Sequence, residues 1–199
     1  MLRKSMTKKN KSGIEYLEQN HINWFPGHMK KAIEKIQQSI KLVNIIIEVR
    51  DARAPMASGN KENYQNRGQK PYLIVLNKTN LADPESVKSW TNWFTKQNES
   101  FVFINALDKK SIKTIIKRAK EVLHTHRLKS NSAATLKDKM KMMILGLPNT
   151  GKSTIINKLA NRDASKAAQR PGQTTSILWV KADKDLEILD TPGVMPPRI

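Results

Sequence analysis

The clearest candidates for chemistry form a G-x-x-x-x-G-K-S segment, Gly146 to Ser153, which follows the apolar run 142–145. Glycines at this spacing let a loop turn its backbone N–H groups inward around phosphate groups. Lys152 adds a positive charge for the β- and γ-phosphates, and the Ser153 hydroxyl can ligate Mg²⁺. The segment therefore predicts a strand, a phosphate-binding loop and a helix from Ser153 to about Ala160, whose N-terminal dipole favours an anion. The plain alternative is a glycine-containing turn after a buried strand.

A second group of candidates lies downstream. The apolar run 186–189 ends in Asp190-Thr191-Pro192-Gly193, and Thr174 lies in a polar loop upstream of it. An acid at the end of a strand beyond a phosphate loop can hold Mg²⁺ through water, and the Gly193 N–H can reach a γ-phosphate. D-x-x-G alone is a weak signal, but together with the phosphate loop and the Thr174 loop it becomes a strong one.

These residues need a scaffold, and the apolar runs supply one. Three more runs, 45–49, 72–76 and 101–104, each end in a polar segment, and the carboxyl edge of an open α/β sheet is where ligands bind. We therefore expect an α/β fold with a six-stranded, mostly parallel sheet and an antiparallel edge strand at 176–180. The expected order across the sheet, which is implied by the family resemblance described below, is 176–180, 186–189, 142–145, 45–49, 72–76, 101–104.

Two helices are predicted between these strands. Asp83-Pro84-Glu85 is a helix start, with Asp83 as the N-cap and proline at the first helical position. The aromatic face that follows, Trp90, Trp93 and Phe94 among others, is assigned to the core, with stacking on nucleobases as the alternative. A second helix, around residues 112–123, is amphipathic.

Charge indicates a polyanionic partner. The net charge is +19, from 36 Lys and Arg against 17 Asp and Glu, and nucleic acid is the first candidate because neutralised phosphates release counterions. Lys113 to Lys141 is the densest basic stretch, although basic charge can also serve solvation alone. The absence of cysteine excludes structural disulfides, and no apolar run approaches membrane-spanning length.

The N-terminal segment 1–22 is predicted to be a basic arm, since its first twelve residues carry five basic side chains and no acid. An organellar transit peptide is the alternative. Asn23-Trp24-Phe25-Pro26-Gly27-His28-Met29 follows. From its pattern alone, His28 is more often a capping or packed residue than a catalytic one.

Taken together, the motifs resemble a known family. Asn77-Lys78-x-x, Asn105-Ala106, the phosphate loop, Thr174 and Asp190 to Gly193 resemble the five GTPase motifs, in the permuted order G4-G5-G1-G2-G3. N-W-F-P-G-H-M, D-A-R-x-P, P-G-x-T-T and D-T-P-G-V together resemble the RbgA/YlqF family of ribosome-assembly GTPases and their mitochondrial counterparts. The resemblance implies a circularly permuted G domain over residues 23–199, a P-loop NTPase of three αβα layers.

The resemblance also implies roles for individual residues, with GTP and Mg²⁺ as ligands. The magnesium shell would be completed by Ser153, Thr174 and Asp190, and Asn149 is similar to the residue that binds K⁺ in potassium-stimulated relatives. The implied nucleotide-binding residues are Asn77, Lys78, Thr79, Asn80, Asn105, Ala106, Asn149, Thr150, Gly151, Lys152, Ser153, Thr154 and Gly193.

Catalysis is implied to involve His28, Lys152 and Thr174. Val194 occupies the position where Ras-type enzymes carry the water-orienting glutamine, and an apolar side chain cannot polarise water. In the family, the histidine of W-F-P-G-H-M is the implied substitute, which points to His28. Such an arrangement predicts slow intrinsic hydrolysis and activation on the ribosome.

Two features depart from the family. Asn80 stands where the family has aspartate, and an amide presents guanine with one acceptor and a mismatched donor. We expect weakened guanine selectivity and a shift toward xanthine nucleotides, unless Asp83 compensates. The chain also ends soon after Gly193, so the switch II helix and the helical C-terminal domain of the family are expected to be absent.

The predicted function is that of a monomeric GTP-hydrolysing assembly factor for the large ribosomal subunit, which binds its precursor and rRNA in a nucleotide-dependent way. It would act in the cytoplasm or, as the alternative, in the mitochondrial matrix or another organelle, without a membrane partner. A second hypothesis is a nucleotide-gated RNA- or ribosome-binding module with little turnover. A third is a small-molecule phosphotransferase that uses ATP.

Overall fold

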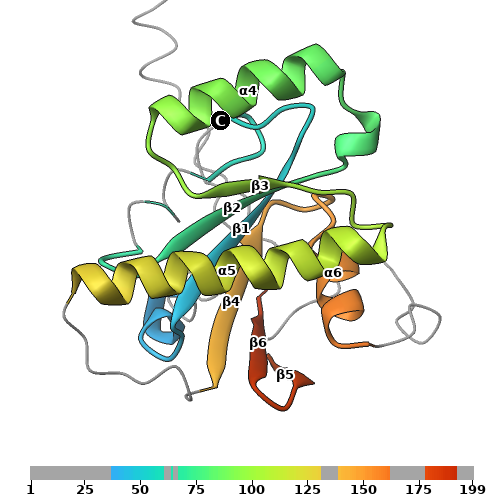
Figure 1. The fold of residues 1–199 in the computed structure, drawn as a ribbon. Coiled ribbons are helices and arrows are strands. Elements are labelled where there is room, and N and C mark those ends of the chain that lie inside the picture. The colour runs from blue at the N-terminus through green and yellow to red at the C-terminus, as the bar shows by residue number, and fades with distance from the viewer. Residues whose placement is uncertain (1–36, 61–63, 65–66, 131–138, 162–177, 192–199) are drawn as a thin grey trace, which may run out of the picture.

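A computed structural model of the 199-residue chain describes residues 37–60, 64, 67–130, 139–161 and 178–191. The predicted basic arm, the segment around His28, the Thr174 loop and Gly193 lie outside these ranges. The described residues form a sheet with helices on both of its faces (Figure 1).

The sheet has six strands in the order β3-β2-β1-β4-β6-β5. Every neighbouring pair is parallel except β5 and β6, which pair antiparallel at one edge. Both the predicted order and the antiparallel edge are thus confirmed. The strands are β1 Ile45–Asp51, β2 Tyr72–Asn77, β3 Phe101–Phe103, β4 Met140–Gly146, β5 Leu178–Asp183 and β6 Leu186–Asp190.

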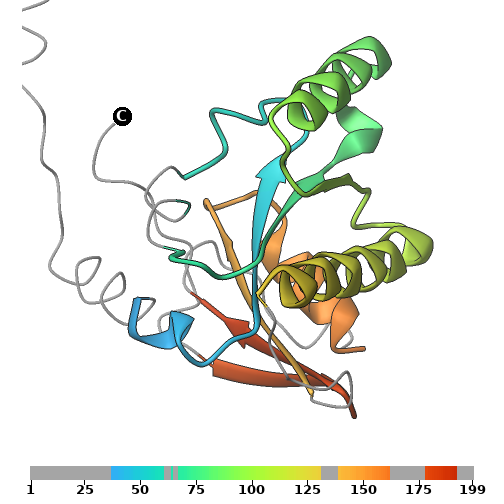
Figure 2. The same ribbon diagram turned by 60° about the vertical axis from the view of Figure 1, so that its left-hand side comes forward.

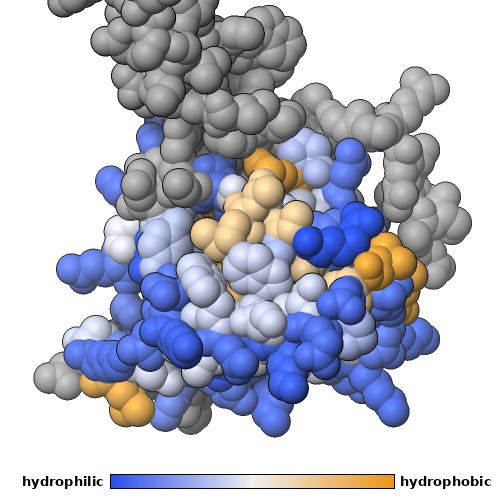
Figure 3. All heavy atoms as spheres, turned by 90° about the horizontal axis from the view of Figure 1, so that it is seen from above, coloured by the Kyte–Doolittle hydropathy of each residue, from blue (hydrophilic) through white to orange (hydrophobic). Residues whose placement is uncertain are grey.

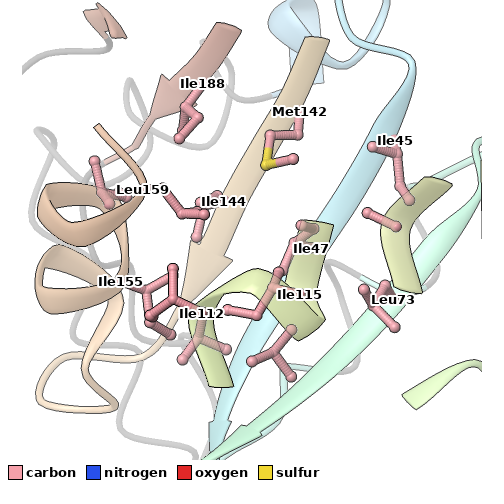
Figure 4. Packing of buried hydrophobic residues seen from close by; sticks show 14 of the residues in the cluster. Ile45, Ile47, Leu73, Ile112, Ile115, Met142, Ile144, Ile155, Leu159 and Ile188 are labelled. Atoms are coloured by element: carbon pink, nitrogen blue, oxygen red, sulfur yellow. The ribbon is translucent and has the colours of Figure 1, made fainter. Parts of the chain in front are cut away.

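The helices divide between the two faces of the sheet. Helices α5 (Lys109–Lys129) and α6 (Lys152–Leu159) bury their apolar side chains with one face of the strands, as Figure 4 shows for Ile112, Ile115 and Ile155. Helix α4 (Pro84–Lys96) packs Phe94 with the opposite face. Figure 2 shows the resulting layers from a second direction. Because both faces are covered, β1, β2 and β4 read as continuous apolar runs rather than as alternating ones.

Two details differ from the sequence expectation. Strand β5 continues to Asp183, three residues beyond the end of the strand expected at 176–180, so the hairpin to β6 turns at Lys184 and Asp185. On α4 only Phe94 is buried, whereas the Trp93 side chain is 37% exposed and packs edge-on against Phe94. The assignment of the aromatic face to the core was therefore wrong for Trp93, whereas Trp90 is half-buried and packs against the core cluster that contains Phe94.

The central strand β1 contains a buried charge pair. Glu48 is fully buried and Arg50 nearly so, and the Arg50 Nε donates to Glu48 Oε2 at 2.5 Å. The other carboxylate oxygen of Glu48 accepts from the backbone N–H of Asn60 at 2.8 Å. Both oxygens of Glu48 are therefore satisfied, which is the condition under which a buried carboxylate is tolerated.

The exposed large apolar side chains are spread over several elements. The most exposed are Leu107, in the loop before α5, and Leu128, in its last turn, and hydrophilic side chains predominate on the face that Figure 3 shows. None of the helices in the described ranges is both long and apolar enough to cross a membrane. The described surface therefore offers a partner charge more than apolar area.

Candidate nucleotide-binding site

The loop between β4 and α6 occupies the carboxyl edge of the sheet, as the sequence predicts. At Gly146, a Cβ atom would lie 2.7 Å from the Val49 carbonyl oxygen of β1, so only glycine permits this approach of the two strands. Asn149 and Gly151 take up positive φ angles of 64° and 96°, which bend the loop back toward the helix. The Thr150 hydroxyl closes the loop internally by donating to the Leu147 carbonyl at 2.9 Å.

The start of α6 carries the groups expected to meet phosphate and metal. Lys152 is the first residue of the helix and is buried, Ser153 is exposed, and Thr154 is half-buried. The Lys152 Nζ lies 3.1 Å from Asp190 Oδ1 and also donates to the Thr191 carbonyl. Two predicted site residues, Lys152 and Asp190, are thus in direct contact, because β4 and β6 are parallel neighbours and Ile144 is paired with Asp190.

Asn77, the last residue of β2, connects three loops. Its amide Nδ2 donates to the Thr150 carbonyl of the phosphate loop at 2.9 Å. Its Oδ1 accepts from the backbone N–H of Ala106 at 2.9 Å. The predicted base-side loops 77–80 and 105–106 are therefore joined to the phosphate loop by one buried side chain.

Gly151 is the residue that makes room for this link. A Cβ atom at position 151 would lie 2.1 Å from the Nδ2 atom of Asn77, closer than any packed carbon and nitrogen atoms can be. The second glycine of the motif is therefore required by Asn77 as well as by its own positive φ angle.

Lys78 forms a second link between the base side and the phosphate loop. It has a left-handed conformation, with φ 65°, and its Nζ donates to the Asn149 carbonyl at 2.7 Å. The same ammonium group lies 2.9 Å from Asp51 Oδ2. Beside it, the Thr79 hydroxyl donates to the Ile104 carbonyl at 2.7 Å and so fixes the turn against the end of β3.

Asn80 and Asn105 stand at the open side of these loops. Asn80 is exposed and lies in a short 3-10 helix, η1, Thr79–Leu81. The side-chain oxygen of Asn105 accepts from the backbone N–H of Leu107 at 3.0 Å. The departure from the family at position 80 thus lies on an accessible surface of the base-side loop.

The structure also decides what Asp83 does. Its carboxylate accepts from the backbone N–H of Ser86 at 2.8 Å and caps α4, which confirms the predicted helix start. The hydrogen bonds from Ser86 lower the pKa of Asp83 below its ordinary value. Asp83 is therefore committed to the helix cap, which argues against its replacing the carboxylate missing at position 80.

Sequence reasoning assigned no role to Asp51, the residue that ends β1. Its carboxylate pairs with Arg53, whose Nη2 lies 2.8 Å from Oδ2, and with Lys78. The hydrogen bond from Arg53 first, and Lys78 with it, hold the pKa of Asp51 well below its usual range, against the opposing effect of burial. Its place at the carboxyl edge of the sheet was a signal that the sequence contained.

The residues expected to hold Mg²⁺ are brought together only in part. Among the described residues, no group of three or more His, Asp or Glu side chains could hold a metal ion. The Ser153 hydroxyl and the Asp190 carboxylate offer the hard oxygen donors that suit Mg²⁺, completed in such sites by phosphate oxygens and water. Thr174, His28 and Gly193 lie outside the described residues, and their roles stay predictions.

The fold and this site define a class of protein. A phosphate loop between strand and helix, with base-side loops that precede it in the chain, is the arrangement of a circularly permuted G domain among the P-loop NTPases. A family model described as "50S ribosome-binding GTPase" matches residues 141–198.

Named proteins that are similar to this chain support its assignment to this class. The chain is 40% identical over 177 residues to Ribosome biogenesis GTPase A of Bacillus pumilus, a match that covers 89% of this chain and 63% of the relative. It is 36% identical to Mitochondrial ribosome-associated GTPase 1 of Mus musculus, over 88% of this chain and 56% of that protein. The structure of GNP-bound YlqF from T. maritima superposes with a TM-score of 0.59 at 32% identity, over 85% of this chain and 60% of that one.

The chain is therefore similar to the RbgA/YlqF family of circularly permuted GTPases. It spans about three-fifths of the length of these curated relatives.

Proposed function

We propose that this chain binds GTP together with Mg²⁺ and hydrolyses GTP to GDP and phosphate. The observation that carries the proposal is the Asn77 side chain, which hydrogen-bonds the phosphate loop at Thr150 and the 105–106 loop at Ala106. These two hydrogen bonds hold the base-side loops next to the phosphate loop. This arrangement suits a ligand that has a nucleobase at one end and phosphates at the other. The family relatives, named as GTPases, support the same ligand.

Each group in the site has a defined task in this proposal. The backbone N–H groups of residues 149–154 and the Lys152 ammonium would hold the phosphates. For this, the ammonium would turn from Asp190 toward the nucleotide, which would free the Asp190 carboxylate to help hold Mg²⁺. When bound with Ser153 and Asp190, Mg²⁺ neutralises charge on the β- and γ-phosphates. Thr174 and Gly193 are proposed to contact the metal and the γ-phosphate.

The attacking water needs an orienting group that Val194 cannot supply. We assign this task to His28 and propose that hydrolysis is slow until the chain binds a ribosomal particle. Potassium at Asn149 is a further part of the proposal and rests on the similarity of this residue to the K⁺-binding residue of potassium-stimulated relatives.

We further propose that the chain acts in assembly of the large ribosomal subunit by binding its rRNA. Helix α5 supports this because it carries eight Lys and Arg residues and a single acid, Glu121. The side chains of Lys113, Lys117 and Lys120 are exposed. Such a face suits a phosphate backbone. The relatives include bacterial and mitochondrial proteins, so the proposed compartment is the cytoplasm or the mitochondrial matrix.

Phosphate release measured with and without large-subunit particles tests the enzymatic proposal. Wild type should release phosphate slowly alone and faster with particles. Lys152→Ala should abolish release because nucleotide is lost, whereas His28→Ala should abolish the stimulation and keep nucleotide binding. Unchanged stimulation in His28→Ala contradicts the assignment of His28, and release by Lys152→Ala contradicts the site.

A second candidate function is a nucleotide-gated RNA-binding module with little turnover. The observation that favours it is Asn80, whose exposed amide replaces the family's carboxylate on the base side. In that case, nucleotide would change co-sedimentation with ribosomal particles, yet phosphate release would stay at the level of Lys152→Ala. Stimulated release in wild type excludes this candidate.

A further inference from the structure

The topology places one carboxylate between two of the loops proposed to hold the nucleotide. Strand β1 is paired in parallel with β2 on one side and with β4 on the other. The residue that ends β1 therefore stands between the base-side loop, which follows β2, and the phosphate loop, which follows β4. That residue is Asp51.

Among the described residues, the Asp51 carboxylate forms hydrogen bonds and ion pairs with two cations and one backbone N–H. Oδ1 accepts from the backbone N–H of Arg53 at 3.0 Å and from its Nε at 2.9 Å. Oδ2 lies 2.8 Å from Arg53 Nη2 and 2.9 Å from Lys78 Nζ. Because Lys78 Nζ also donates to the Asn149 carbonyl, a continuous path runs from Asp51 through Lys78 to the phosphate loop.

The backbone around Asp51 is fixed independently of these charges. Its N–H donates to the Ser58 hydroxyl at 2.9 Å, and that hydroxyl donates to the Ala54 carbonyl at 2.6 Å. The next residue, Ala52, donates its N–H to the Asn77 carbonyl at 2.7 Å. The loop after β1 therefore fixes the backbone that carries the Asp51 carboxylate. The Lys78 ammonium is the mobile partner, which this carboxylate positions.

The negative charge of Asp51 and the positive charge of Arg53 would affect nucleotide binding in different ways. A lysine side chain in water samples many rotamers, and fixing it before a ligand arrives lowers the entropy lost on binding. A bare carboxylate beside a nucleotide would, however, repel its phosphates. The guanidinium of Arg53, held by two parallel hydrogen bonds, offsets that charge while leaving Oδ2 in contact with Lys78.

We infer that Asp51 is a positioning residue for nucleotide binding: its carboxylate holds the Lys78 ammonium against the Asn149 carbonyl and so orders the phosphate loop in advance. The inference rests on the proposed binding of guanine nucleotide. It adds the D-A-R-x-P segment to the site as a support for the base-side lysine, with Arg53 as the neutralising partner.

A double-mutant cycle on the 199-residue chain tests it, with a fluorescent GDP analogue as the probe. Asp51→Asn keeps the size of the side chain but turns an amide donor toward the ammonium. It should weaken binding about tenfold, the scale expected when a charge-assisted hydrogen bond is lost. In a Lys78→Met background, Asp51→Asn should weaken binding less than about twofold, because Asp51 acts through Lys78. The control is Glu187→Gln, which breaks an ion pair with Lys139 of 3.4 Å at the opposite edge of the sheet and should change nothing.

The outcomes separate this inference from the proposed function. If wild type does not bind the analogue, the proposed function fails. If wild type binds and Asp51→Asn binds equally well, or loses as much affinity in the Lys78→Met background as in wild type, the positioning role is overturned and a purely structural one remains. Thermal unfolding is followed for each variant, and Asp51→Glu replaces Asp51→Asn if the latter unfolds below the assay temperature. Asp51→Glu keeps the charge but displaces it, so it too should weaken binding only while Lys78 is present.

Discussion

Replacing Gly151 by alanine should destabilise the protein through a contact that lies on another strand. An alanine at φ 96° costs about 1–2 kcal/mol, because an L-residue is strained in the left-handed region. The new Cβ would also lie 2.1 Å from Asn77 Nδ2, so the Asn77 amide must move. Moving it breaks the hydrogen bonds to Thr150 and from Ala106, at about 0.5–1.5 kcal/mol each. The expected total is about 2–5 kcal/mol.

Gly68→Ala is the matched control. Gly68 also has a positive φ of 60°, but a Cβ there would meet no atom within 4 Å. Its replacement should cost only the backbone strain of about 1–2 kcal/mol. The two variants are compared by urea unfolding, and nucleotide affinity is measured for both. Only Gly151→Ala should lose affinity as well as stability.

A double mutant tests whether the collision with Asn77 causes the loss of stability in Gly151→Ala. In an Asn77→Ala background the amide is gone, so Gly151→Ala should cost no more than Gly68→Ala costs in wild type. If Gly151→Ala and Gly68→Ala differ by less than about 0.5 kcal/mol in wild type, the proposed collision with Asn77 is refuted. Gly151 would then not be required to make room for the Asn77 side chain between the loops.

The other predictions concern the base side, pH and salt. Asn80→Asp should raise affinity for GTP relative to XTP and ATP by restoring a carboxylate that accepts from guanine, and no gain for GTP in a competition series would contradict this. Asp83→Ala should lower the melting temperature, because a helix cap is lost, and leave the ratio of GTP to XTP affinity unchanged. The Asp51 pKa lies below its ordinary value of 3.8 in the folded state, so its contribution to stability is complete above about pH 5 and declines as the pH falls further. The difference in unfolding free energy between wild type and Asp51→Asn should therefore shrink between pH 5 and pH 2, and a constant difference would refute the assignment. Co-sedimentation with ribosomal RNA should weaken steeply as the salt concentration rises. The salt dependence should be less steep in a variant with glutamine in place of three exposed lysines of α5, Lys113, Lys117 and Lys120. An equal salt dependence in the two proteins would show that this face is not the RNA contact.

Much of the fold could be predicted because its signals are local. The apolar runs of β1, β2 and β4 are continuous since helices cover both faces, and the polar segments after them mark the carboxyl edge of the sheet. The strand order followed from the resemblance carried by the motifs, and the structure confirms it. The Asp83 cap was likewise visible, since proline follows a short acid at the start of a helical pattern.

The aromatic face of α4 shows that local signals do not predict how deeply each side chain is buried. Helical spacing put Trp90, Trp93 and Phe94 on one side of α4, but Phe94 is buried, Trp90 is half-buried and Trp93 is exposed. Periodicity gives the direction of a side chain and carries no information about what lies opposite it.

The sequence by itself determined the elements, the phosphate loop and the resemblance to the RbgA/YlqF family, because each of these depends on residues that are neighbours along the chain. Only the tertiary structure decided that Asn77 needs Gly151, that Lys152 meets Asp190, and that Asp51 holds Lys78. Those partners are separated by 74, 38 and 27 positions, and they meet because parallel strands carry their carboxyl ends to one edge. Which atoms touch there depends on the register of pairing between strands, and that register is set by the packing of the whole sheet.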